Sequence, residues 1–182
     1  MKRAILVPAA LVPDALEELK SWLSISTAYE DNLLTGLLQA SLDTCEGFIR
    51  QMPLEAQCEE IIRASSAWHL LDTYPVLAVT DVHEIGEAGA RVALGSAAFE
   101  LDFYDNGGAR IRLRQRTTGN RVAVRFTAGL ASGWASCPDA IRHGVVRLAA
   151  HMYRQRDTGT ASPVPPAAIA ALWSPWRRMR LA

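Results

Sequence analysis

Apolar residues recur three and four positions apart in three stretches of the chain, residues 13–23, 29–50 and 138–156. This spacing predicts helices with one apolar face, because positions three and four apart lie on the same side of a helix. Glu30 and Asp31 lie in the first turn of the second helix, where the helix dipole favours negative charge. The apolar face of that helix consists of Leu33, Leu34, Leu37, Leu38, Cys45, Phe48 and Ile49.

The pattern changes between residues 57 and 128, where short runs of alternating apolar and polar residues are separated by turn residues. Such alternation predicts strands, because successive side chains of a strand point to opposite faces. The sequence Asp105-Asn-Gly-Gly predicts a hairpin turn between residues 97–104 and 109–113. After a second turn at residues 118–120, a further strand carries Val122, Val124 and Phe126. These segments predict a small antiparallel β-unit with one polar face.

The chain changes again after the third helix, because residues 157–166 are rich in proline and small residues. They predict an extended linker, followed by a short helix at residues 167–173. The whole pattern predicts an α+β fold that is mainly a helical bundle with an inserted small antiparallel β-unit and an extended C-terminal arm. Its parts are the N-terminal helices of the bundle (1–51), the β-rich insertion (52–136), the third bundle helix (137–157), and the linker, short helix and basic docking tail (158–182).

The composition predicts a folded protein that is made in the cytoplasm and has no membrane partner. Hydrophobic residues make up 49% of the 182 residues, yet no stretch approaches the ~20 apolar residues that span a bilayer. The apolar run of residues 4–12 is interrupted by proline, and we expect an N-terminal arm there rather than a signal peptide. The three scattered cysteines form no disulfide framework, which indicates reduced thiols.

Charge is distributed unevenly, although the net charge is zero. Residues 1–60 carry 4 Lys and Arg against 10 Asp and Glu, whereas residues 137–182 carry 7 against 2. The acidic and basic regions could meet within one chain. They could equally meet between neighbouring copies in a head-to-tail ring, where the two contact surfaces differ. The sequence alone leaves both arrangements open.

The motifs of common active sites are missing from the sequence. There is no dinucleotide or phosphate-binding glycine loop, no nucleophile elbow and no zinc-protease motif. The four histidines are dispersed, and two of the three adjacent acid pairs fall in helix first turns, where the dipole explains them. We therefore expect no catalytic residue, no metal site and no cofactor, with a small enzyme of unknown class as an alternative.

Four arginines alternate along one predicted strand and continue past it. They would form a basic row with steps of about 6.6 Å, since each arginine is two positions from the next. Such a row could contact nucleic-acid phosphates or an acidic protein neighbour, or it could be a solvated strand face that discourages edge pairing. The last two interpretations are favoured, because no aromatic residues alternate with the arginines to stack bases. With two polar residues of the third helix, the candidate lumen or subunit contacts are Arg110, Arg112, Arg114, Arg116, His143 and Arg147.

The C-terminal end concentrates tryptophan and arginine, the residue types that dominate interaction hot spots. A tail behind a proline-rich linker can bury its indoles in a partner, by folding on binding. We therefore predict that the tail docks on a partner. In the alternative, the short helix and both indoles pack back onto the chain's own helices. The residues concerned are Trp173, Trp176, Arg177, Arg178 and Arg180.

Several segments, in this order and spacing, carry a resemblance to a known family. They are Leu16-x-x-Leu-Lys-x-Trp-Leu, Glu30-Asp-Asn-Leu-Leu, Glu46-Gly-Phe-Ile, Val122-Ala-Val-Arg-Phe-Thr-Ala-Gly, Cys137-Pro-Asp-Ala-Ile-Arg-His-Gly, Ala149-Ala-His-Met-Tyr-Arg-Gln-Arg-Asp and the end from Pro165 to Leu181. Together they cover most of the chain apart from residues 52–90. The chain resembles the head–tail connector (adaptor) family of tailed bacteriophages, and in particular the adaptor of gene transfer agents.

The resemblance implies a structural subunit that assembles into a ring of about twelve copies below the portal of a phage or gene transfer agent particle. DNA would pass through the lumen of the ring. The implied partners are the portal protein, identical copies and the next tail component, a stopper or tail terminator. The subunit would be synthesised in the bacterial cytoplasm and incorporated at the head–tail junction. The implied portal-binding residues are Leu172, Trp173, Pro175, Trp176, Arg177, Arg178, Met179, Arg180 and Leu181.

A third function class remains beside the connector and the enzyme. A nucleic-acid-binding accessory protein would use the arginine clusters at residues 110–116 and 177–180. Its affinity for DNA would fall steeply with salt, because each bound phosphate releases counterions.

Overall fold

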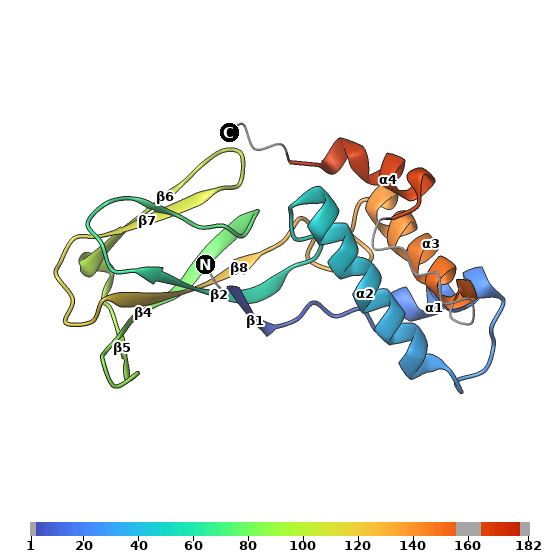
Figure 1. Ribbon diagram of the computed structural model, residues 1–182, viewed down its shortest axis with the longest axis horizontal. Helices are drawn as coiled ribbons and strands as arrows, with labels where there is room; N and C mark the ends of the chain where they lie inside the picture. The colour runs from blue at the N-terminus through green and yellow to red at the C-terminus, as the bar shows by residue number, and fades with distance from the viewer. Residues whose placement is uncertain (1–2, 156–164, 179–182) are drawn as a thin grey trace. The chain divides into compact units, whose positions relative to one another are not determined.

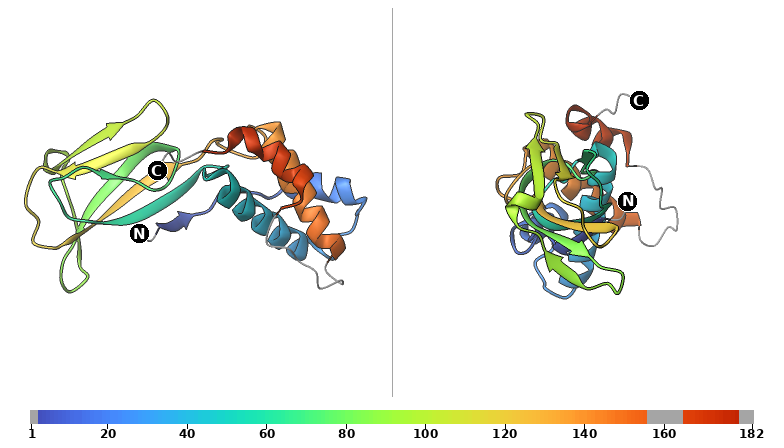
Figure 2. Two further views of the ribbon diagram at one scale, coloured as in Figure 1. Left: turned by 45° about the horizontal axis from the view of Figure 1, so that its top comes forward. Right: turned by 90° about the vertical axis from the view of Figure 1, so that its left-hand side faces the viewer.

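The computed structural model describes residues 3–155 and 165–178, which form two compact units. One unit consists of the described residues up to Pro8 together with Glu55–Gly129 and contains the strands. The other contains the helices and consists of Ala9–Leu54 with the described residues from Leu130 onward. Figures 1 and 2 show the helices and strands of each unit, coloured from the N-terminus (blue) to the C-terminus (red).

The β-unit contains two antiparallel sheets. The larger sheet has, in spatial order, β1 (Arg3–Val7), β2 (Ala56–Arg63), β8 (Arg121–Ala128), β4 (Val76–Ile85) and β5 (Arg91–Ala93). The smaller sheet has β3 (His69–Leu70), β7 (Ala109–Leu113) and β6 (Phe99–Phe103), with the short 3₁₀ helix η1 (Ser96–Ala98) before β6.

In the hairpin with the Asp105-Asn-Gly-Gly turn, buried and exposed side chains alternate along the strand. In β7 the residues Ala109, Ile111 and Leu113 are buried, while the arginines between them are partly exposed. Strand β8 lies in the middle of the larger sheet, and Val122, Val124 and Phe126 are buried there. The hairpin and the β8 pattern predicted from the sequence are both present in the structure.

The helical unit contains α1 (Asp14–Leu23), α2 (Asp31–Ile49), α3 (Asp139–Gln155) and α4 (Ala167–Trp173), followed by the 3₁₀ helix η2 (Ser174–Trp176). The apolar faces of these helices meet in one core. Fully buried members from α1, α2 and α3 are Leu19, Leu34, Leu38, Cys45, Ile49, Ile141, Val145 and Ala149. The predicted helices therefore exist at the predicted positions, although Leu33 of the predicted apolar face is exposed.

The expectation of a mainly helical bundle with a small β-unit is wrong. About 35% of the chain is helical and 29% is strand, so the fold is α+β with a substantial sheet. The sequence pattern did not identify β1, β2, β3 or β5, and the reasons differ for β1 and β2. Strand β1 forms within the expected N-terminal arm and is a continuous apolar run without alternation. Strand β2 carries two adjacent acids in its interior, which is unusual for a central strand.

Both acids of β2 are buried because the β-unit supplies partners for them. Glu59 is 5% exposed and accepts hydrogen bonds from Arg91 and Arg125. Glu60 is 1% exposed and accepts hydrogen bonds from the backbone N–H groups of Asp72 and Thr73 and from the Thr73 hydroxyl. A buried carboxylate is tolerated only when it is paired or hydrogen-bonded, so these contacts are what place charged residues inside a sheet.

None of the described helices combines the length and the apolar character that crossing a membrane requires.

Candidate interaction surfaces

Helix α4 packs against α2 and α3 through Trp173. The Trp173 side chain is completely buried, and its indole N–H donates a hydrogen bond to the Ile141 carbonyl oxygen at 3.3 Å. Its ring centroid lies 6.0 Å from that of Phe48 in α2. A Cβ atom at Gly144 of α3 would clash with the indole, so the glycine creates the notch that Trp173 fills. Trp173 is therefore part of the core of the helical unit.

The residues after α4 continue along the same surface. The Gln51 side-chain amide donates a hydrogen bond to the Trp176 carbonyl oxygen at 2.5 Å, and the Arg178 backbone N–H donates one to the Ile49 carbonyl oxygen at 2.9 Å. The Arg177 guanidinium lies 5.5 Å from the centroid of the Phe48 ring. The end of α2 thus holds residues 176–178 in place.

For the tryptophans, the structure shows the packing that the sequence left as the alternative. Trp173 is fully buried, and Leu172 and Trp176 are partly buried against the same core. Pro175 and Arg177 are the exposed members of the predicted docking segment. Met179, Arg180 and Leu181 lie outside the described residues. Docking of this segment on a partner stays a prediction, and only its exposed groups are available for it.

Most of the predicted arginine row is neutralised by the neighbouring strand. The register of the hairpin places Asp102 opposite Arg110 and Glu100 opposite Arg112. The charged atoms approach to 2.7 Å in the first pair and 2.6 Å in the second, and Arg114 lies 3.4 Å from the same Glu100. The hydrogen bond from Arg112 lowers the pKa of Glu100 below its usual value. These pairs make the face of β6 and β7 a mixed ladder of charges.

An aromatic residue that the sequence reading missed also lies on this face. Trp68 comes from the segment before β3, and its ring is 4.4 Å from the Arg110 guanidinium and 4.6 Å from that of Arg112. The ring faces of tryptophan attract cations, which adds to the ion pairs. Trp68 is more than forty positions away from the arginines, so no local spacing could have indicated this contact.

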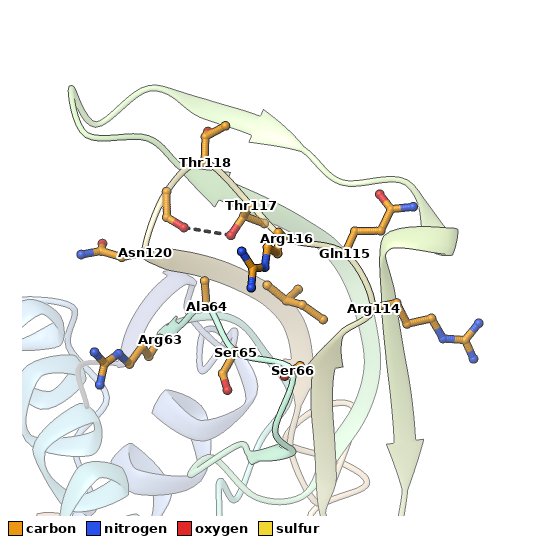
Figure 3. Close-up of a pocket in the computed structure, with 12 residues that line it drawn as sticks. Arg63, Ala64, Ser65, Ser66, Arg114, Gln115, Arg116, Thr117, Thr118 and Asn120 are labelled. Atoms are coloured by element: carbon orange, nitrogen blue, oxygen red, sulfur yellow. Dashed lines mark hydrogen bonds between the residues drawn. The ribbon is translucent and has the colours of Figure 1, made fainter.

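Arg116 lies beyond the ladder, in a hollow at the end of the β-unit (Figure 3). The hollow has a volume of about 650 Å³ and lies between the loop that follows β2 and the loop that joins β7 to β8. It is lined by Arg63, Ala64, Ser65, Ser66, Leu113, Arg114, Gln115, Arg116, Thr117, Thr118, Gly119 and Asn120. Three of these residues are arginines and none is acidic.

His143 and Arg147, the other predicted contact residues, lie on α3. The His143 ring lies nearly perpendicular to the Trp22 ring of α1, with a centroid distance of 5.2 Å and an interplanar angle of 81°. Trp22 remains 44% exposed and lines a shallow hollow of about 620 Å³ with Glu18, Ser21 and Arg154. Arg147 is partly exposed. The structure therefore places these residues on the helical unit and the four alternating arginines on the β-unit.

The buried thiols lack the features of a nucleophile. Burial raises the pKa of Cys45 well above its usual value and raises that of Cys137 to about 11. Both thiols therefore stay protonated near neutral pH, and a thiol is a poor nucleophile. Within residues 3–155 and 165–178, no three histidine, cysteine or acidic side chains come together as a metal site would require.

Comparison with solved structures finds similar chains over almost the whole length. A chain of the neck of an empty GTA particle, computed with C6 symmetry, is 26% identical with a TM-score of 0.78, and the match covers 100% of this chain and 98% of that one. A chain of the virion of a native gene transfer agent (GTA) particle is 25% identical with a TM-score of 0.77 and the same coverage.

A third similar chain belongs to the neck of a native GTA particle computed with C12 symmetry. It is 26% identical with a TM-score of 0.74, and the match covers 98% of this chain and 97% of that one. Family models and curated proteins yield no match to the chain.

Proposed function

We propose that this chain is a structural subunit of the neck of a phage or gene transfer agent particle, and specifically its head–tail connector (adaptor). The observation that carries the proposal is the match of both units together, over 100% of this chain and 98% of a neck chain, with a TM-score of 0.78. A fold alone would not define a function. Here the sequence identity of 26% and the ordered motifs of the sequence support the same role.

The subunit forms a ring in the neck. The similar neck chains come from particles computed with C6 and C12 symmetry, which supports a ring of about twelve copies. The portal protein binds on one side, the next tail component (a stopper or tail terminator) binds on the other, and DNA passes through the lumen. The chain is made in the bacterial cytoplasm and is incorporated at the head–tail junction.

Charge supports a head-to-tail interface in that ring. Some of the acidic and basic groups pair within the helical unit, for example Arg142 with Glu18 at 3.5 Å and Lys20 with Asp31 at 2.7 Å. The exposed Arg154 and partly exposed Arg147 of α3 and the exposed Asp14 and Glu17 of α1 remain for contacts between copies. A heterologous interface of this kind uses two different surfaces on each subunit and closes into a ring.

The C-terminal segment binds the portal, and its buried and exposed residues have different roles. Trp173 anchors the segment in the Gly144 notch, and the partly buried Leu172 and Trp176 continue that anchor. Pro175 and Arg177 present exposed groups to the portal. The segment is therefore a surface that is held in place before binding, which lowers the entropy cost of association.

A genetic complementation experiment tests the proposed function. Particles assembled without the gene should contain filled heads that lack tails, and supplying the wild-type chain should restore tailed particles that contain it. Tailed particles that form normally without the chain would contradict the neck role.

A nucleic-acid-binding accessory protein is the second candidate, favoured by the hollow with three arginines and no acid. Such a protein would bind DNA and be absent from purified particles. Its presence in particles at many copies distinguishes the connector from this alternative.

A further inference from the structure

The hollow at the end of the β-unit has the chemistry of a phosphate contact. The side chains that line it are guanidinium, hydroxyl and amide groups, which are the groups that contact phosphate oxygens in protein–nucleic-acid complexes. Its only aliphatic side chains are Ala64 and Leu113, and it contains no aromatic residue. Protein interfaces concentrate aromatic and apolar residues at their centres, so this lining fits a polyanion better than a protein surface.

Acids near the hollow offset its charge only in part, because three arginines line it and one carboxylate, Glu84, adjoins it. Glu84, next to it, accepts hydrogen bonds from the Thr118 hydroxyl and the Gly119 backbone N–H, and these bonds lower the pKa of its carboxyl. Glu100 is engaged mainly by Arg112, and its distance to Arg114 is the longer one at 3.4 Å. Arg63 and Arg116 have no acidic partner among the ion pairs of the described residues.

The two loops that form the hollow are fixed by backbone hydrogen bonds. The Ala64 N–H donates to the Asn120 carbonyl oxygen at 2.9 Å, and the Leu113 N–H donates to the Ser65 carbonyl oxygen at 3.0 Å. A further bond within the second loop, from the Thr117 hydroxyl to the Gly119 carbonyl oxygen at 2.8 Å, is drawn in Figure 3. The arginines therefore project from a preformed frame.

The arginines point apart rather than converge on one point. Figure 3 shows Arg116 over the middle of the hollow, whereas Arg63 and Arg114 extend outward on opposite sides of it. A single inorganic anion would be enclosed by converging groups. Three separated charges instead suit a chain of phosphates.

We infer that this hollow is a sequence-independent contact for the phosphate backbone of DNA, made by Arg63, Arg114 and Arg116. The inference rests on the proposed function, in which DNA passes the subunit. The contact is weak because only three charges take part. Weak contacts of this kind guide a moving strand without holding it.

The test measures binding of the full-length protein to two fluorescently labelled 20-base-pair duplexes of unrelated sequence. Fluorescence anisotropy gives the binding constant at increasing NaCl concentrations. Three phosphate contacts predict a slope of log K against log salt of about −2.7, since each contact contributes about −0.9. Arg116→Gln should reduce the slope by about one and weaken binding about tenfold at low salt, equally for both duplexes.

The matched control is Arg110→Gln, which changes the net charge equally but removes an arginine that is paired with Asp102. It should leave the slope unchanged. Equal effects of the two substitutions would overturn the inference, because binding would then reflect general surface charge. Should Arg116→Gln lower the thermal midpoint, the exposed Arg63→Gln replaces it, and this variant should also reduce the slope by about one.

Two further outcomes would also overturn the inference. One is calorimetric binding of inorganic phosphate at the hollow without any duplex binding, which would make it a site for a single anion. The other is loss of self-association in Arg116→Gln with unchanged DNA affinity, which would make it a protein interface. These measurements use the isolated chain, so absence of DNA binding would not contradict the neck role. Failed complementation by a chain that still binds DNA would contradict the neck role alone.

Discussion

At the scale of single residues, the most consequential pair is Gly144 and Trp173. The Trp173 indole occupies the place where a residue larger than glycine at position 144 would have its Cβ atom. The linker separates the two residues in the sequence. Neither residue is informative alone, since a helical glycine and a C-terminal tryptophan each have several ordinary explanations. Together they show that the C-terminal segment is fixed to the helical unit before any partner binds.

Substitution of Gly144 by alanine should destabilise the protein. The new methyl group clashes with the Trp173 indole, and overpacking of this kind costs about 1–3 kcal/mol. The free energy of unfolding from urea titration gives the measurement. Gly47→Ala is the matched control, because Gly47 is also helical and a Cβ there meets nothing within 4 Å. It should stabilise by about 0.5–1 kcal/mol, and equal effects at the two positions would contradict the notch.

The pH dependence of stability has a residue-level prediction at Glu59. Its hydrogen bond with Arg91 is the largest cause of a pKa below the usual 4.5. A carboxyl with a lowered folded-state pKa contributes stability above its unfolded-state pKa and loses it as the pH falls through the folded-state value. Wild type should therefore be more stable than Glu59→Gln at pH 7, and the gap should shrink below about pH 4.5. A gap that stays constant down to pH 2 would contradict the charge pairing.

At the scale of elements, the helices were predictable from the sequence and part of the sheet was not. The helices follow from apolar positions three and four apart, and the hairpin follows from its turn residues. Strand β2 was not clear, because Glu59 and Glu60 place charge on both of its faces and their partners come from distant segments. The row of arginines was predictable from their alternation along the strand. Their partners were not, because the position of the β6 acids depends on strand register and that of the Trp68 ring on tertiary folding.

The docking role of the C-terminal element is tested by its exposed residue rather than by its deletion. Deleting residues 173–182 removes the buried Trp173 and should unfold the helical unit, so lost assembly would be ambiguous. Arg177→Glu should leave the thermal midpoint within about 2 °C, since surface substitutions usually change stability by no more than ~0.5 kcal/mol. It should reduce co-purification with the portal protein.

Arg121→Glu supplies the control for this experiment, because Arg121 is exposed on the β-unit and undergoes the same charge reversal. It should co-purify with the portal as well as wild type does. Normal portal binding by Arg177→Glu would remove Arg177 from the docking surface.

At the scale of the whole molecule, two folding units with different tasks account for the structure. The helical unit carries the anchored C-terminal segment and the Trp22 surface, while the β-unit carries the charge ladder and the basic hollow. Both units are matched together in the GTA neck chains, over 97% or more of each chain. That joint match is the reason for assigning the chain to a neck rather than to a generic sheet or bundle.

The most direct measurement is a cryo-electron microscopy reconstruction of the particle neck. An epitope tag on the chain, labelled with an antibody, locates the subunit. The account predicts a ring of about twelve copies between portal and tail, into which the described residues fit as they are folded here. A reconstruction in which the tagged chain is absent from the head–tail junction, or occurs there as a single copy, would contradict it.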